Sequence, residues 1–113
     1  MNKNVTVRDA GDVKILDLKG KITIGAGDLH MREAIHQTLA GGAKKILINM
    51  KEVTTIDSTG VGELVGCYTT ATNKGAKLRL ANLPEKINDV LTVTQLITVF
   101  DVYTSEAEAL AGF

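Results

Sequence analysis

Short apolar stretches in the first quarter of the chain have the pattern of β-strands. Residues 5–7 alternate apolar and polar side chains, and residues 10–12 carry the signal of a tight hairpin turn. The next stretch, residues 13–18, has apolar side chains on both faces, so we expect a strand that is largely covered. Gly20 interrupts it, and residues 21–24 are predicted to extend the sheet beyond a bulge.

Three later segments have the apolar spacing of amphipathic helices. The first covers about residues 29–40, with Asp28 as its expected N-cap and a Gly-Gly pair at its end. The second begins near Thr59 and closes at residues 73–75. The third has Pro84, the only proline, in its first turn, where proline is favoured.

Apolar runs between and after these helices predict the remaining strands. Residues 46–48 have the character of a buried central strand, and residues 77–81 and 99–103 are expected to be strands as well. Ser105 and Glu108 have the capping-box spacing of a short C-terminal helix. Helical crossovers favour parallel strands, whereas the N-terminal pair, joined by a tight turn, is expected to be antiparallel.

These elements predict one α/β domain over residues 1–113, with a mixed, mostly parallel sheet of about four or five strands and about four helices. A length of 113 residues suits a single domain. Aromatic residues make up only 4% of the chain and there is no Trp, so the core is expected to be aliphatic.

The charge balance gives no support for nucleic acid or an anionic membrane as a partner, because 13 basic and 13 acidic residues cancel. The N-terminus has no apolar stretch of the kind found in signal peptides, and no apolar run is long enough to span a bilayer. Cys67 is the only cysteine, so no intrachain disulfide is expected. We therefore expect a cytoplasmic protein.

Histidine, cysteine and acidic residues, which often act in catalysis, show no catalytic pattern in this sequence. His30 and His36 are six residues apart on a predicted helix and point in different directions, so no metal site is expected. Cys67 lies within a helix beside its apolar stripe and is expected to be a core thiol. Glu52 and Asp57 have no local histidine or second acid with which to form an acid–base pair.

The glycine-containing loops also lack the marks of cofactor sites. Residues 25–27 begin like a dinucleotide fingerprint, but His30 stands where its third glycine belongs. Residues 41–45 lack the spacing and the hydroxyl residue of a Walker loop, and no Gly-x-Ser-x-Gly elbow is present. We predict no cofactor and no enzymatic activity, with nucleotide binding left open but unsupported.

One stretch combines an acid, two hydroxyls and two glycines at the start of a predicted helix. In a structural interpretation Asp57 or Ser58 caps the helix, Thr59 starts it, and Gly60 and Gly62 allow close packing. In a functional interpretation the two glycines leave the first turn bare, so that a partner can approach the Ser58 hydroxyl. The residues alone leave both interpretations open.

The segment from Ile56 to Gly62, between a strand and a helix, resembles the signature of STAS domains, and within them it is most similar to the anti-sigma factor antagonists. The resemblance covers nearly the whole chain. It includes Gly20, the Asn49-Met50 pair before the signature, and the ending over residues 100–110. The family implies a STAS-like α/β fold.

The resemblance also implies a function and a site. An anti-sigma factor with serine kinase activity would phosphorylate Ser58, with Thr59 as a secondary acceptor, and a PP2C-type phosphatase would remove the phosphate. The unphosphorylated chain would bind the anti-sigma factor and release the sigma factor. The partner-binding residues carried over from the family are Asp57, Ser58, Thr59, Gly60 and Gly62.

Two alternatives accompany this hypothesis. A STAS module of a signalling scaffold or of a lipid-transport complex would keep the fold and use Ser58 only structurally. A nucleotide-binding or hydrolysing domain is the second alternative, and the missing phosphate loop counts against it. The chain also departs from many family members over residues 21–25, because no acidic residue follows Gly20 there, which leaves the kinase open.

Overall fold

A computed structural model describes residues 4–113 of the chain. Its elements are β1 (Val5–Ala10), β2 (Val13–Ile22), α1 (Asp28–Ala40), β3 (Lys45–Ile56), α2 (Ser58–Asn73), β4 (Lys77–Ala81), α3 (Glu85–Val93), the 3-10 helix η1 (Leu96–Thr98), β5 (Asp101–Tyr103) and α4 (Glu106–Leu110). The five strands form a single sheet in the order β1-β2-β3-β4-β5. Strands β1 and β2 are antiparallel, and the other pairs are parallel, as predicted.

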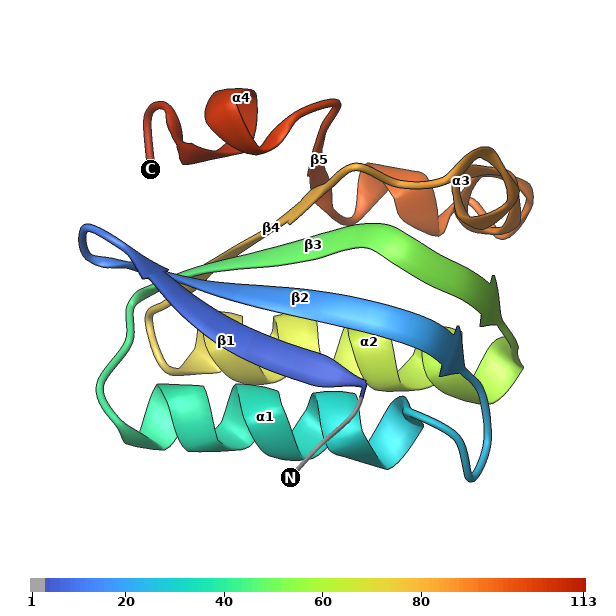
Figure 1. The fold of residues 1–113 in the computed structure, drawn as a ribbon, viewed down its shortest axis with the longest axis horizontal. Helices are drawn as coiled ribbons and strands as arrows, with labels where there is room; N and C mark the ends of the chain where they lie inside the picture. The colour runs from blue at the N-terminus through green and yellow to red at the C-terminus, as the bar shows by residue number, and fades with distance from the viewer. Residues whose placement is uncertain (1–3) are drawn as a thin grey trace.

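The sheet is covered unequally on its two faces. Helices α1 and α2 lie side by side under one face (Figure 1), and Ile87 and Leu91 of α3 join the same core, while α4 lies on the other face. The main core fills the space beneath the sheet, and its buried members within residues 4–113 are aliphatic side chains, Met, Cys and one aromatic, Phe100. The expected aliphatic core is therefore confirmed, and Val61 and Leu64 of α2 are both buried in it.

Strand β2 is buried on both faces, as its sequence indicates. Leu16 and Leu18 belong to the main core, whereas Val13 and Ile15 face a smaller cluster beneath α4. The pairing of β2 with β3 shifts between Asp17 and Lys19 and again after Gly20. The predicted irregularity at Gly20 is therefore present, but the strand continues through it to Ile22.

The predicted cap of α1 is wrong. Asp28 is the first helical residue and is buried, and the preceding Gly27 stands at the N-cap with φ 88°, a left-handed conformation that favours glycine. In the described part of the chain, no side chain caps this helix. The sequence pattern predicted Asp28 at the N-cap, one position before its actual place in the helix. Either residue of the Gly-Asp pair is compatible with an N-cap, so the pattern alone does not locate the start of the helix.

Helix α4 is held to the sheet by a buried arginine. Arg79 on β4 donates hydrogen bonds to the backbone oxygens of Ala109, Ala111 and Gly112, at 2.9, 3.0 and 3.1 Å. Its guanidinium also stands over the Phe113 ring at 4.3 Å from the centroid. The predicted Ser105 cap is confirmed, since its hydroxyl accepts from the Glu108 N–H.

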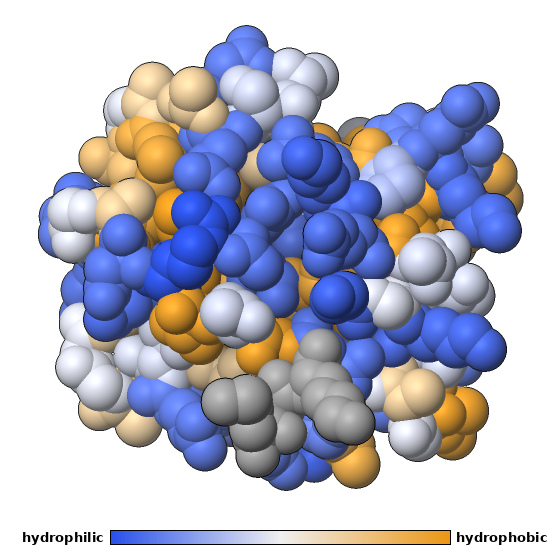
Figure 2. Space-filling view, in the orientation of Figure 1, coloured by the Kyte–Doolittle hydropathy of each residue, from blue (hydrophilic) through white to orange (hydrophobic). Residues whose placement is uncertain are grey.

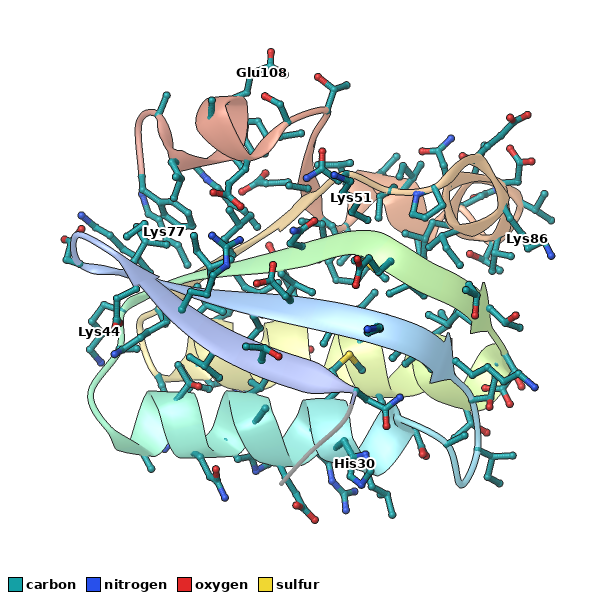
Figure 3. All side chains as sticks on the ribbon, viewed as in Figure 1. His30, Lys44, Lys51, Lys77, Lys86 and Glu108 are labelled. Carbon is teal, nitrogen blue, oxygen red and sulfur yellow. The ribbon has the colours of Figure 1, made fainter. Side chains whose placement is uncertain are left out.

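The sheet face that carries α4 also bears a row of polar side chains. Asn49 donates to Asp17 at 2.8 Å and accepts from Asn82 at 3.0 Å, and Arg8 is paired with Asp17. The Arg8 guanidinium lowers the pKa of the Asp17 carboxyl. Lys51 projects on this side of the sheet (Figure 3), beside a hollow of about 370 Å³. Within residues 4–113, no helix has both the length and the apolar content needed to cross a bilayer.

Candidate functional site

The start of helix α2 answers the question of which residue caps it. Asp57 is the N-cap, with an extended backbone, and its Oδ1 accepts a hydrogen bond from the Gly60 N–H at 2.8 Å. Ser58 is the first helical residue and is exposed. Of the two caps that the sequence left open, Asp57 is therefore the one used.

The Ser58 side chain has no structural task in the fold. Its hydroxyl makes no hydrogen bond with any residue in the described range 4–113. The first helical hydrogen bond runs from the Val61 N–H to the Asp57 carbonyl, at 2.9 Å, and does not involve this side chain. An exposed hydroxyl at a helix N-terminus, where backbone N–H groups favour negative charge, is left free for chemistry.

Asp57 also ties this helix to a second segment of the chain. Its other oxygen, Oδ2, accepts from the backbone N–H of Ile24 at 3.0 Å, across the turn between β2 and α1. The Ile24 N–H lowers the pKa of the Asp57 carboxyl most, followed by the Gly60 N–H. The carboxylate is therefore ionised at neutral pH and stands next to Ser58 as a fixed negative charge.

The two glycines of the stretch are used differently. A Cβ on Gly60 would lie 1.9 Å from the Ile22 carbonyl oxygen, so this glycine lets α2 pack directly against the end of β2. A Cβ on Gly62 would meet no atom within 4 Å, and this residue is exposed. The predicted close packing is thus made by Gly60, while Gly62 keeps the surface beside Ser58 open.

The remaining predicted site residue, Thr59, is half-buried, and its role as a secondary acceptor stays a prediction. The structure brings Ile24 to the site, which the sequence did not indicate. Residues 21–24 have the β-branched pattern of a strand, and only the fold shows that Ile24 leaves the sheet and reaches Asp57. No local signal in the sequence reveals that contact, because the two residues are 33 positions apart.

The other reactive side chains are placed away from Ser58 or buried. His30 lies on the outer side of α1, where its Nδ1 is 2.9 Å from Asn4 Oδ1 (Figure 3). Among residues 4–113 no group of three His, Cys, Asp or Glu side chains is placed to hold a metal ion. Cys67 is 1% exposed, and its burial raises the pKa of the thiol to about 12, so the expectation of a core thiol is confirmed.

Comparison with known proteins places this chain in a family. The family model described as the STAS domain matches residues 4–109. The chain therefore belongs to the STAS domain family. The anti-sigma-B factor antagonist of Bacillus subtilis (strain 168) is 30% identical over 103 residues, which cover 90% of this chain and 92% of that protein.

Solved structures show the same fold at lower identity. An anti-sigma factor antagonist from Mycobacterium paratuberculosis aligns with a TM-score of 0.81 and 20% identity, covering 94% of this chain and 89% of that one. The Bacillus cell fate determinant SpoIIAA in its phosphorylated form aligns with a TM-score of 0.70 and 21% identity, covering 94% and 96% of the two chains. The predicted STAS-like fold and the anti-sigma factor antagonist family are thereby confirmed.

Proposed function

We propose that this protein is an anti-sigma factor antagonist whose partner binding is switched off by phosphorylation of Ser58. The unphosphorylated chain binds an anti-sigma factor with serine kinase activity and so frees a sigma factor. A PP2C-type phosphatase restores the binding form. The chain acts as a binding protein and catalyses no step itself.

The observation that carries this proposal is the division of tasks between Asp57 and Ser58. Asp57 caps α2 with one oxygen and holds Ile24 with the other, so the helix start is complete without Ser58. Ser58 is exposed and unbonded within residues 4–113, which gives a kinase access to its hydroxyl. A serine that served as the cap would have to give up its hydrogen bond on modification.

The electrostatics support a switch that changes binding more than folding. A phosphate brings about −1.5 to −2 charges at pH 7, and the N-terminus of α2 is an environment that stabilises such charge. Beside the ionised Asp57, however, the same phosphate concentrates negative charge on the surface that a partner would have to cover. A loss of about 1.4 kcal/mol in the complex already lowers affinity tenfold.

The test combines the purified chain with the anti-sigma kinases of its own genome and ATP. Phosphopeptide mapping is expected to find the label on Ser58, and Ser58→Ala is expected to abolish it, while Thr59→Ala serves as the matched control and keeps it. Ser58→Asp is expected to weaken kinase binding at least tenfold in calorimetry and to leave the melting temperature nearly unchanged. If no kinase modifies Ser58, the chain is a STAS module without this switch, and the proposal is wrong.

A further inference from the structure

The segment between β2 and α1 is a tight, closed turn. Thr23 and Ala26 exchange two backbone hydrogen bonds, both of 2.8 Å, which leave Ile24 and Gly25 at the corner. Gly25 has φ +74°, a conformation that glycine adopts without strain. Two reciprocal bonds across so short a loop fix the direction in which the Ile24 side chain points.

The same turn is fixed to the start of α2. The Ile24 N–H donates to Asp57 Oδ2, while Oδ1 of the same carboxylate holds Gly60 of the helix. Gly27 supports the turn from the other side, since a Cβ there would lie 2.2 Å from the Lys21 carbonyl oxygen. One carboxylate therefore joins Ile24 to the helix that presents Ser58.

This rigid turn exposes apolar surface next to the serine. The Ile24 side chain is 72% exposed, and Leu29, in the first turn of α1, is 46% exposed. Figure 2 shows hydrophobic surface at the lower right of the molecule, the corner where Figure 1 draws this turn beside the start of α2. Backbone hydrogen bonds hold this loop in place and yet leave the Ile24 side chain in water. In that position the side chain adds no stability to the fold.

Such a side chain has the properties of a binding anchor. Removing an aliphatic side chain from water favours association, and one that is already held in place loses little conformational freedom on binding. Interfaces concentrate their affinity in a few well-packed residues near their centre. The remaining large exposed apolar side chains, among them Val93 on α3, belong to other elements of the described chain.

We propose that Ile24 is an apolar anchor that enters a hydrophobic pocket of the anti-sigma factor when that partner covers Ser58, with Leu29 extending the contact. This inference rests on the proposed function and adds to it the chemistry of the contact. The partner reads two features of one surface, a hydroxyl that carries the regulation and an isoleucine that carries affinity. Charge at Ser58 and loss of the side chain at position 24 weaken the same complex by independent routes.

The experiment measures binding of four full-length variants to the cognate anti-sigma factor by calorimetry. Ile24→Ser is expected to weaken binding about tenfold or more, which corresponds to about 1.4 kcal/mol. Ile24→Leu is expected to keep nearly wild-type affinity, because the apolar contact is retained. Val93→Ser is the matched control, since it removes a side chain that is 83% exposed on another helix, and it is expected to change nothing. The fourth variant, Ser58→Asp, tests the proposed function.

The outcomes separate the two proposals. If Ser58→Asp weakens binding but Ile24→Ser does not, the switch stands and the anchor is wrong. If the wild-type chain binds no anti-sigma factor, both are overturned. Sedimentation of the wild type and of Ile24→Ser, each without partner, tests whether a second copy of this chain binds the apolar turn instead. If the wild type self-associates and Ile24→Ser does not, the turn binds a second copy and the anchor is wrong. The melting temperatures of all variants are expected to remain close to that of the wild type.

Discussion

Helices α1 and α2 begin beside each other at one edge of the sheet (Figure 1), and an aspartate stands at each start, yet the two carboxylates do different work. Asp28 lies inside the first turn of α1, 4% exposed, and its Oδ1 accepts no hydrogen bond within residues 4–113. Asp57 stands one position earlier relative to its helix and uses both oxygens. A shift of one residue relative to the helix start decides whether the carboxylate caps the helix. At α2, where Asp57 is the cap, the side chain of the next residue, Ser58, is left free of this task.

Each of the two helix starts also contains a glycine that packs closely against the end of β2. Gly27 approaches the Lys21 carbonyl and Gly60 approaches that of Ile22. Together they bring both helix N-termini to the same strand end. The open first turn at Ser58 is therefore a product of packing inside the chain, and the proposed partner surface is built on the same contact that stabilises the fold.

The largest effect is expected from breaking this packing. Gly60→Ala would place a Cβ 1.9 Å from a backbone oxygen, which forces α2 away from β2, and we expect a loss of at least about 2–3 kcal/mol in the free energy of unfolding. Gly62→Ala is the matched control, because its Cβ would enter open space, and it is expected to stabilise the helix by about 0.5–1 kcal/mol. Urea unfolding of both variants measures the difference, and equal effects would contradict the assigned packing role.

A smaller effect sharpens the comparison between the aspartates. Asp57→Ala removes a helix cap and the bond to Ile24, and we expect a measurable loss in unfolding free energy. Asp28→Ala is expected to cost less, because one of its oxygens is unbonded among the described residues. Ser58→Ala is expected to stay within about 0.5 kcal/mol of the wild type, as a surface change without a lost partner. A larger loss for Ser58→Ala than for Asp57→Ala would reverse the assignment of the cap.

The smallest expected effect is on pH dependence. Backbone N–H groups lower the pKa of Asp57 in the folded chain below that of an unfolded aspartate, which is about 3.9. Its ionised form therefore adds stability that is fully present above that unfolded pKa and is lost as the pH falls through the folded pKa. Thermal melts between about pH 2 and 6 are expected to show a shallower acid loss for Asp57→Asn than for the wild type. Ser58→Ala, which removes no ionisable group, is the control and is expected to keep the wild-type slope.

The sequence predicted those elements whose signals are local. The bounds of β4 coincide with the predicted alternation over residues 77–81, and the capping box at Ser105 is present. Strand β3 runs on to Ile56, well beyond the compact run at 46–48, because its later apolar residues also face the core. Its length was missed because polar residues interrupt the apolar pattern there.

At the candidate site, the sequence singled out the stretch but could not divide the tasks within it. The choice between Asp57 and Ser58 as cap depends on where α2 begins, and helix starts are uncertain by a residue or two. The contact between Asp57 and Ile24 and the packing of Gly60 against Ile22 join distant segments, so they exist only in the folded chain. The proposed anchor at Ile24 depends on these contacts and has no local signature.

The burial of Cys67 has a practical consequence for experiments on this helix. The residue lies in the middle of α2, and only its thiolate would react with a thiol-directed dye. With the thiol buried and its pKa raised to about 12, labelling of the native chain has to wait for α2 to open. The labelling rate thus reports how often the helix that begins at Ser58 leaves the core, and the chain already carries this probe as its single cysteine.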